Sequence, residues 1–383
     1  MIMQRITVKE LSALDGDQLA IVDLRDESAF SYGHIAGAIN VPADKIADFT
    51  PQKGKKTVFY CRTGQISGEI VQNLREKGHD AYELEGGYMA WLTAHVSDLA
   101  QDTAEKVEQG LRTRFHKKLF TKFAKAINEY RLLEPNDKVA VCMSGGKDSM
   151  LMAKLFQELK RHNKFPFELV FLVMDPGYSR ENREIIERNA KVLNVPITVF
   201  ETDIFENVFN IEKSPCYICA RMRRGHLYAK AKELGCNKIA LGHHYDDVIE
   251  TTLMGMLYGG QMQTMMPRVD SENFEGMRLI RPMYLIREED VKAWRDYYNL
   301  QFIQCACKFT DTCTSEGCNS QSNAASKRQK VKKLIWGLKN EDPEIEQNIF
   351  KSTENVNLST ILAYKDKNGV KHYFWDEDEK EEK

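Results

Sequence analysis

Short apolar runs alternate with longer amphipathic stretches along most of the chain. An apolar run of four to eight residues is typical of a buried strand, and apolar positions three or four apart are typical of a helix. In the first hundred residues this pattern predicts strands at 19–23, 56–60 and 81–84 and helices at 67–77 and 89–95. Strands separated by helices indicate an α/β domain.

A second series of the same kind begins at residue 138. The predicted strands are 138–143, 168–174, 196–202 and 238–242. One predicted helix follows residue 149, and four others lie at 180–193, 220–234, 248–258 and 326–338. Because helical crossovers join strands that run in the same direction, this series predicts a doubly wound parallel sheet.

The stretch between the two series, residues 97–131, differs from both. It contains no proline and one glycine and is helix-forming throughout, so we expect a helical linker followed by the N-terminal helix of the next domain. It also contains an acid-free basic segment with Arg112, Arg114, Lys117 and Lys118. Such a segment is either a solvated helix face or a surface that contacts nucleic-acid phosphates. The predicted divisions of the chain are 1–97, a basic helical linker at 98–131, a second α/β domain at 132–345 and a C-terminal extension at 346–383.

Composition narrows the class of protein. Hydrophobic residues make up 42% of the 383 residues and charged residues 29%, which is the balance of a folded globular protein. The 54 Lys and Arg against 56 Asp and Glu exclude a uniformly cationic nucleic-acid coat. A local basic surface is still compatible, because the tail at 376–383 carries six of the acids. We predict that this tail is disordered.

The sequence contains no candidate membrane span. The longest apolar run, 169–174, has six residues, whereas a span needs roughly 20. The N-terminus lacks the apolar core of a secretion signal, so we expect a cytoplasmic protein that does not bind a membrane. The nine cysteines are an odd number, which argues against a secreted disulfide framework. Six of them fall in two groups, at 216–219 and 305–318, which favours metal, cluster or sulfur chemistry.

One cysteine lies where a strand leads into a helix. Cys61 follows the predicted strand 56–60 and opens a loop that contains Gly64. Glycine permits a turn that points successive N–H groups inward, and the following helix N-terminus adds partial positive charge. Both effects stabilise a thiolate or a persulfide anion. The alternative is that Cys61 is a small core residue.

The surrounding segments decide between these interpretations. IVDLR at 21–25, GHIAGAINVP at 33–42, the Cys61 loop and EGGYMAW at 85–91 together resemble a single-domain rhodanese, over roughly residues 4–97. Rhodaneses carry sulfane sulfur on the loop cysteine, so the resemblance implies that Cys61 is a persulfide carrier. The chain departs from many members in having Ile66 where they have arginine, which removes a cation from the loop rim and disfavours thiosulfate turnover.

The second series contains a loop suited to phosphate. It joins the predicted strand 138–143 to a helix through Ser144, Gly145, Gly146, Lys147, Asp148 and Ser149. Two glycines let the backbone approach an anion, and the N–H groups, the serine hydroxyls and the helix dipole all favour one. The spacing is not the Walker pattern. The loop resembles the PP-loop of the N-type ATP pyrophosphatases, which implies that these six residues bind ATP, that a substrate is adenylated, and that Asp148 has a catalytic role.

Two further acidic positions are expected near the nucleotide. GHHYDD at 242–247 follows a predicted strand and should reach the same sheet edge as the loop. Asp246 and Asp247, with His243 beside them, would hold Mg²⁺ near the phosphates, or one of the two aspartates would cap the next helix. Asp175, at the end of another strand, is expected on the adenosine side of ATP.

Cys216 and Cys219 form a CxxC pair within reach of one metal, and Arg221, Arg223 and Arg224 follow closely. Such a pair serves as a redox couple, as half of a zinc site or as part of an iron–sulfur site. No thioredoxin-like strand pattern surrounds it, which disfavours the redox couple. Two other cysteines, on or beside predicted strands, are expected in the core: Cys142 and Cys236.

Three long stretches, at 114–157, 216–266 and 279–289, resemble the tRNA 2-thiocytidine synthetases, within a match over roughly residues 110–340. That family replaces the C2 oxygen of an anticodon-loop cytidine with sulfur, using ATP, Mg²⁺ and a [4Fe–4S] cluster held by three cysteines. The resemblance therefore implies Cys216 and Cys219 as two cluster ligands and tRNA as the substrate.

The third cluster ligand stays open at this stage. Register from the Asn-Ser-Gln stretch at 319–321 favours Cys318, whereas register from the preceding strand favours Cys305 or Cys307. Cys313 lies in an insertion between these positions.

Three functions fit these features. The first is an ATP-dependent tRNA sulfurtransferase, fed with sulfur through Cys61 by a cysteine desulfurase. The second is a zinc-containing PP-loop ligase or amidase with a small-molecule substrate, and the third is a sulfur carrier without catalysis. The basic residues at 112–118 and 221–224 favour an RNA substrate and hence the first function. We expect 2-thiocytidine at tRNA position 32, with a different tRNA base as the alternative product, and a homodimer is compatible with the sequence.

Overall fold

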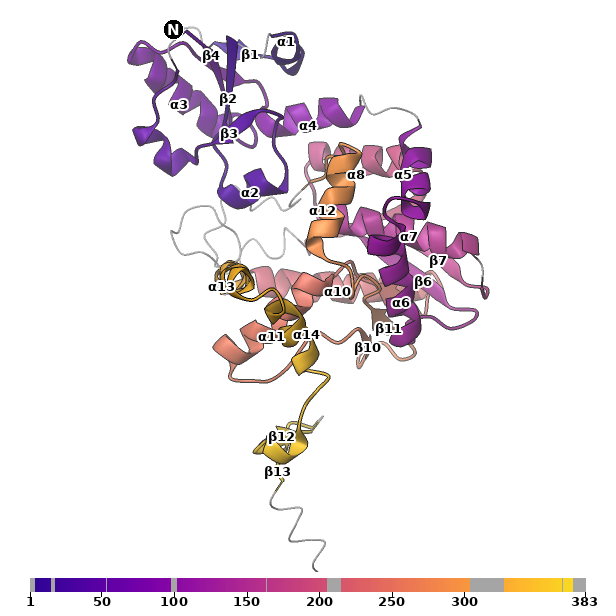
Figure 1. Cartoon of the computed structure of the whole chain (residues 1–383). Helices are drawn as coiled ribbons and strands as arrows, with labels where there is room; N and C mark the ends of the chain where they lie inside the picture. The colour runs from indigo at the N-terminus through magenta and orange to yellow at the C-terminus, as the bar shows by residue number, and fades with distance from the viewer. Residues whose placement is uncertain are drawn as a thin grey trace, which may run out of the picture. The chain divides into compact units, whose positions relative to one another are not determined.

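A computed structural model describes residues 4–14, 18–52, 54–97, 102–162, 164–204, 215–303, 327–366 and 368–374. The chain divides into two compact units: Met1–Tyr245 with Met266–Ser326, and Asp246–Met265 with Lys327–Lys383. The two larger sheets, several of whose strands are labelled in Figure 1, belong to the first unit. Among the described helices, none is both long enough and apolar enough to cross a membrane.

The N-terminal series forms a five-stranded sheet. Its strands are β1 (Arg5–Ile6), β2 (Leu19–Asp23), β3 (Ala38–Asn40), β4 (Lys56–Tyr60) and β5 (Ala81–Leu84). They lie in the order β1-β5-β4-β2-β3, and every neighbouring pair is parallel. The three predicted strands are confirmed with their bounds. The two that the pattern missed, β1 and β3, are edge strands of two and three residues, too short to give an apolar run.

Helices α1 (Val8–Ser12), α2 (Glu27–Tyr32), α3 (Gln65–Glu76) and α4 (Gly87–Ser97) and the 3-10 helix η2 (Ala43–Asp48) complete this domain. The predictions of helices at 67–77 and 89–95 are confirmed as α3 and α4, each of which begins two residues earlier. α3 begins at Gln65 because Gly64, in the left-handed conformation, ends the preceding loop.

The second series forms a six-stranded sheet. Its strands are β6 (Lys138–Met143), β7 (Glu168–Asp175), β8 (Ile197–Glu201), β9 (Lys238–Ala240), β10 (Arg268–Asp270) and β11 (Arg278–Ile280). The order is β10-β11-β9-β6-β7-β8, and all pairs are parallel except β10 with β11. The predicted parallel sheet is confirmed, although β9 ends at Ala240 rather than at residue 242 and the short strands β10 and β11 were not predicted.

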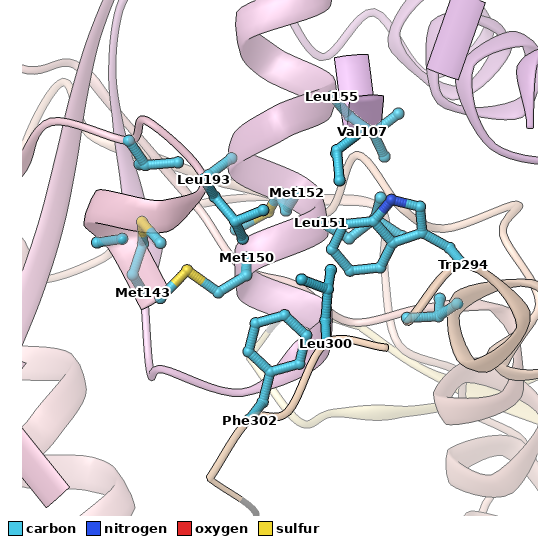
Figure 2. Packing of buried hydrophobic residues seen from close by; sticks show 14 of the residues in the cluster. Val107, Met143, Met150, Leu151, Met152, Leu155, Leu193, Trp294, Leu300 and Phe302 are labelled. Carbon is cyan, nitrogen blue, oxygen red and sulfur yellow. The ribbon is translucent and has the colours of Figure 1, made fainter. Parts of the chain in front are cut away.

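The helices of this domain are α7 (Lys147–His162), α8 (Arg180–Val192), α10 (Pro215–Glu233) and α12 (Glu288–Tyr297). α7 follows the phosphate loop and is buried along much of its length. Figure 2 shows Met150 and Leu151 of α7 among the core side chains that include Trp294 and Phe302. The rings of Trp294 and Phe302 stack with centroids 6.0 Å apart. This packing holds the start of α7 rigidly at the edge of the sheet.

The helix-forming sequence at 97–131 does not form one unbroken helix in the described residues. From residue 102 onwards the structure has α5 (Thr103–Arg112), a π-helix η3 (His116–Phe120) and α6 (Thr121–Glu129). The chain leaves helical geometry at Thr113, where φ is −123° and ψ −91°. Phe115, Leu119 and Phe123 are all buried, and the break and the π-turn shift the helical register so that they share the core face.

The second unit contains most of α11 (Tyr245–Gly259), followed by α13 (Lys327–Glu341), α14 (Ile345–Ser352) and the 3-10 helix η5 (Leu358–Thr360). An antiparallel hairpin, β12 (Ala363–Lys365) with β13 (Lys371–Tyr373), follows. The predicted helices at 248–258 and 326–338 are confirmed as α11 and α13. The acidic tail at 376–383 lies outside the described residues.

Candidate active site

The phosphate loop connects β6 to α7 at the carboxyl edge of the parallel sheet. The two serines at its ends tie it together, with Ser144 Oγ 3.3 Å from Ser149 Oγ and the Ser144 N–H donating to Ser149 Oγ at 3.2 Å. The Ser149 hydroxyl also donates to the Gly146 carbonyl at 3.0 Å. These bonds hold the loop in a closed turn whose shape does not depend on a ligand.

The two glycines are required for different reasons. Gly145 has φ +82°, and a Cβ there would lie 2.5 Å from Ile186 Cγ1. At Gly146 the nearest group to a Cβ would be the Tyr32 hydroxyl, at 3.2 Å. A side chain at Gly146 would therefore crowd that hydroxyl, and glycine keeps this part of the loop backbone free of one. This fits a loop that presents its backbone to a phosphate.

Of the charged residues of the loop, Lys147 is buried and Asp148 is half-buried, and the two form an ion pair. Lys147 is 3% exposed, and its ammonium lies 3.0 Å from Asp148 Oδ2 and 3.7 Å from Glu288 Oε1. Asp148 Oδ1 is buried and accepts no hydrogen bond within the described residues, and His244 Nε2 lies 3.8 Å from it. Asp148 thus offers one carboxylate oxygen to a group that enters the site.

The start of the GHHYDD segment, Gly242 to His244, reaches this edge, as expected. A Cβ at Gly242 would be 3.4 Å from the Asp148 carbonyl carbon and from the Ser149 nitrogen, so the end of β9 runs close to the start of α7. His244 faces Asp148, and the assignment of His243 to the ATP site stays a prediction. The sequence contained no signal to separate these adjacent histidines, because the choice depends on how the chain turns after β9.

Asp246 and Asp247 lie in the first turn of α11, so neither is the residue that caps the helix. In the second unit the Asp247 carboxylate lies 2.5 Å from the Arg328 guanidinium of α13, which also contacts Glu250 at 2.7 Å. Burial raises the pKa of Glu250, and Arg328 opposes that shift. The assignment of Asp246 and Asp247 to Mg²⁺ stays a prediction.

Asp175 ends β7 on the same edge of the sheet. Its Oδ1 accepts hydrogen bonds from the N–H groups of Gly177 at 2.9 Å and Tyr178 at 2.6 Å, and its Oδ2 lies 3.0 Å from Arg183. Asp175, Tyr178 and Arg183 help to line a cavity of about 490 Å³. The carboxylate therefore shapes the loop around this cavity, and its role beside adenosine stays a prediction.

The Cys61 loop has a comparable build in the N-terminal domain. Gly64 has φ +100°, and its N–H donates to Cys61 Sγ at 3.2 Å. Ser67 Oγ is 3.4 Å from the same sulfur. Cys61 is 4% exposed, and the predicted N–H group that points into the loop is present. Ile66 is 53% exposed at the rim.

The N-terminal domain contacts the segment that precedes the second group of cysteines. The Tyr88 N–H donates to the Cys61 carbonyl at 2.9 Å, and the Tyr88 hydroxyl donates to Gln301 Oε1 at 3.3 Å. The Tyr32 hydroxyl donates to the Ile303 carbonyl at 3.1 Å and accepts the Lys147 N–H at 3.2 Å. No local pattern in the sequence marked Tyr32 or Tyr88, because both act across more than a hundred residues.

The cysteines separate into two kinds. Cys142 and Cys236 are buried in the core, as predicted, and burial raises the pKa of Cys142 to about 12 and raises that of Cys236. Cys216 and Cys219 lie in the first turn of α10. Cys305, Cys307, Cys313 and Cys318 lie outside the described residues. Within the described residues no group of three or more His, Cys, Asp or Glu side chains forms a metal site.

The basic residues proposed to contact RNA also differ among themselves. Arg112 lies 2.9 Å from Glu158 and 3.5 Å from Glu108, and Lys118 lies 3.1 Å from Asp290. The Arg114 guanidinium lies over the Tyr297 ring, 4.4 Å from its centroid. Arg114, Lys117, Arg221 and Arg224 are exposed and have no ion pair within the described residues, and Arg223 lies 3.5 Å from the Tyr178 hydroxyl. All seven stay predicted RNA contacts.

The fold and the loop define an ATP-binding protein of the PP-loop class with a rhodanese-like domain attached. A family model of the PP-loop domain matches residues 115–308, just over half of the chain, and a model of the rhodanese-like domain matches residues 7–94.

Curated relatives narrow the family further. The tRNA-cytidine(32) 2-sulfurtransferase of Aliivibrio salmonicida is 35% identical over 262 residues, which are 68% of this chain and 81% of the relative. The enzyme of the same name from Syntrophotalea carbinolica is 33% identical over 252 residues, covering 65% and 93%. A solved structure, the U34-tRNA thiolase NcsA from Methanococcus maripaludis with its [4Fe-4S] cluster, aligns with a TM-score of 0.47 and 21% identity, covering 61% of this chain and 76% of that one. The chain belongs to the PP-loop family that includes the tRNA-cytidine(32) 2-sulfurtransferases.

Proposed function

We propose that this protein is an ATP-dependent tRNA sulfurtransferase that converts cytidine 32 to 2-thiocytidine. The observation that carries the proposal is the phosphate loop at residues 144–149, closed by its own serines and without a side chain at Gly146, in a chain whose curated relatives bear that name. The zinc-containing ligase or amidase and the sulfur carrier lack comparable support.

In this proposal the loop residues orient ATP for attack by the C2 oxygen of the base. The backbone at Gly146 and the start of α7 face the phosphates, where the helix dipole and the N–H groups stabilise negative charge. The Lys147 ammonium, held between Asp148 and Glu288, adds positive charge beside the loop. Adenylation turns the C2 oxygen into part of a phosphate ester, a good leaving group, and sulfur then replaces it with release of AMP.

Asp148 is proposed as a group that acts on ATP directly. Its Oδ2 is engaged by Lys147, whereas Oδ1 accepts no hydrogen bond within the described residues. An oxygen of this kind suits Mg²⁺, which prefers carboxylate ligands next to ATP phosphates. Asp246 and Asp247 are further candidate Mg²⁺ ligands.

Cys216 and Cys219 are proposed to hold a [4Fe–4S] cluster with one cysteine from the 305–318 group, for which we propose Cys318. Their positions in one helical turn fit two ligands of a single site. With three cysteine ligands the cluster would supply an open iron that accepts sulfide. The basic residues that follow, Arg221 and Arg224, are proposed to contact the anticodon-loop phosphates.

Cys61 is proposed to receive sulfane sulfur from a cysteine desulfurase and to pass it toward the second group of cysteines. The Tyr88 contacts support this path, since they link the Cys61 carbonyl to Gln301, four residues before Cys305. In the transfer the thiolate of an acceptor cysteine attacks the outer sulfur and forms a new S–S bond with it, while the S–S bond to Cys61 breaks and Cys61 leaves as a thiolate. Release of the transferred sulfur as sulfide is a two-electron reduction, for which a dithiol in the assay supplies the electrons.

The function is tested with anaerobically reconstituted protein and unmodified tRNA, followed by mass spectrometry of the nucleosides. We expect 2-thiocytidine at position 32 only when ATP is present, and its absence from the tRNA of cells that lack the gene. A different thiolated base would replace the proposed substrate, and thiolation without ATP would exclude adenylation. Iron and acid-labile sulfide, lost in Cys216→Ala and Cys318→Ala but kept in Cys236→Ala, test the cluster assignment.

The sulfur path has its own test. With a desulfurase and cysteine as the sulfur source, Cys61→Ser should thiolate at least 10-fold more slowly than the unaltered protein. With excess sulfide the two should be equally fast, because sulfide bypasses Cys61. Equal rates with the desulfurase would remove Cys61 from the path.

A further inference from the structure

Tyr32, the last residue of α2, reaches from the rhodanese-like domain into the phosphate loop. Its hydroxyl accepts the Lys147 N–H at 3.2 Å and donates to the Ile303 carbonyl at 3.1 Å. Three other observations describe its surroundings. Arg295 donates to the Tyr32 carbonyl, and the Lys147 ammonium lies 5.1 Å from the ring centroid. The hydroxyl lies 3.2 Å from the position that a Cβ of Gly146 would take.

The position of this hydroxyl is the one that suits a phosphate oxygen. Lys147 is the first residue of α7, and its N–H is one of the four that have no partner within the helix. These N–H groups form the anion-binding end of a strand–loop–helix unit. Burial, reinforced by the nearby Asp148 carboxylate, raises the pKa of Tyr32, so its oxygen keeps its proton and is a neutral acceptor. A phosphate oxygen at the same place would form a stronger, charge-assisted bond.

We propose that Tyr32 is a gate on the phosphate loop, so that docking of α2 and binding of the ATP phosphates exclude each other. The inference rests on the proposed function and adds a regulation of its site. In the docked state the Tyr88 contacts hold the Cys61 loop against the Gln301 segment. In the ATP-bound state the phosphates take the Lys147 N–H and α2 is displaced. Because such coupling is reciprocal, docking weakens ATP binding by the same factor by which ATP weakens docking.

The gate separates two phases of the reaction. Sulfur is delivered while the rhodanese-like domain covers the loop, and adenylation takes place after the domain has moved away. This order keeps the RNA base from being adenylated by ATP before sulfur is available. The hydroxyl is unsuited to donate to ATP in the docked state, since its proton is already given to the Ile303 carbonyl.

The test measures binding of α,β-methylene-ATP, which cannot be cleaved between the α and β phosphates, to the full-length protein by calorimetry. Tyr32→Phe keeps the ring and removes the hydroxyl, so we expect it to bind the analogue about 2- to 10-fold more tightly than the unaltered protein. Tyr82→Phe is the control, since the Tyr82 ring lies against Lys56 and Arg75, away from the phosphate loop, and should leave the affinity unchanged.

Hydrogen exchange supplies a second readout. In the unaltered protein the analogue should speed the exchange of α2 amides, because it releases the helix from the loop. Equal or weaker binding by Tyr32→Phe, or α2 protection that the analogue does not change, would overturn the gate. The binding assay uses no tRNA and no sulfur donor, and it does not require the cluster. If neither the unaltered protein nor Tyr32→Phe bound the analogue, both the proposed ATP dependence and the proposed gate would be wrong.

Discussion

Two strand–loop–helix units in this protein use one backbone design for two chemistries. The loop between β4 and α3 contains Gly64 at φ +100°, and the loop between β6 and α7 contains Gly145 at φ +82°. In the first loop the N–H of Gly64 binds the sulfur of Cys61, within the same loop. In the second the serine hydroxyls bind each other, and the N–H of Lys147 binds a group from elsewhere, Tyr32.

The difference shows what decides the chemistry of such a loop. A side chain that fills the loop, as Cys61 does, takes the inward N–H for its own sulfur, which is the arrangement expected of a loop that carries one sulfur atom. A loop whose centre is two glycines leaves its N–H groups to an acceptor from outside and becomes a binding site. Each loop can therefore be disabled separately, and the two half-reactions should fail separately.

The largest effect is expected from Gly145→Ala. The new Cβ would lie 2.5 Å from Ile186 Cγ1 on a backbone at φ +82°, so the loop must distort. We expect loss of nucleotide binding and at least a 100-fold loss of thiolation, while persulfide loading of Cys61 is unchanged. Gly78→Ala is the control, because Gly78 has φ +85° with nothing within 4 Å and should cost only about 1–2 kcal/mol of strain. Full thiolation by Gly145→Ala would show that ATP binds elsewhere.

The matching change in the other loop is Gly64→Ala. Its Cβ would lie 2.9 Å from Glu83 Oε1, and Glu83 is held by Arg5 at 3.2 Å. The shift should pull the Gly64 N–H off Cys61 Sγ and lower persulfide loading by about 10-fold, the value of one charge-assisted hydrogen bond. Nucleotide binding and sulfide-fed thiolation should be unaffected. A loss of nucleotide binding would mean that the two loops do not fail independently.

A smaller effect is expected from a change at Glu158 of α7, whose carboxylate holds the basic linker through Arg112. Burial raises the pKa of Glu158, but hydrogen bonds from Arg161 and Arg112 outweigh it and leave the pKa below its ordinary value of 4.5. A lowered carboxyl pKa adds stability above the ordinary pKa that is lost as the pH falls through the folded-state pKa. Glu158→Gln should therefore cost about 1–2 kcal/mol at pH 7 and progressively less below pH 4, measured by thermal unfolding.

The matched control for that change is Glu129→Gln. Glu129 pairs with Lys125 at 3.5 Å where both side chains are exposed, so the loss should stay below about 0.5 kcal/mol. If Glu158→Gln were equally mild at pH 7, the ion pairs of Arg112 would not anchor the linker, and Arg112 would be as available to RNA as Arg114.

The smallest effect is expected from Ile66→Arg at the rim of the Cys61 loop. Ile66 is 53% exposed, so arginine adds a cation without disturbing the core. The rate of thiosulfate turnover should rise about 2- to 5-fold, in keeping with an exposed charge interaction of up to 1 kcal/mol. The melting temperature and desulfurase-fed thiolation should not change. A thiosulfate rate that stays the same would mean that the departure at this position has no bearing on the sulfur donor.

The sequence by itself determined the two α/β domains and the two loops. β4, β6 and β7 are buried parallel strands, which read as continuous apolar runs, and each loop places its glycines and functional side chains within a few consecutive residues. The short strands β1, β3, β10 and β11 were invisible to the pattern, since two or three residues carry no periodicity.

Only the tertiary structure decided what faces each loop. The break of the linker at Thr113 follows from the need to bury Phe115 and Leu119 together, which helix propensity alone does not reveal. His244 rather than His243 meets Asp148 because of the turn after β9. Tyr32 meets Lys147 and Ile303 across separations of 115 and 271 residues. Local patterns specify elements and loops, whereas contacts at such separations depend on the packing of whole domain surfaces.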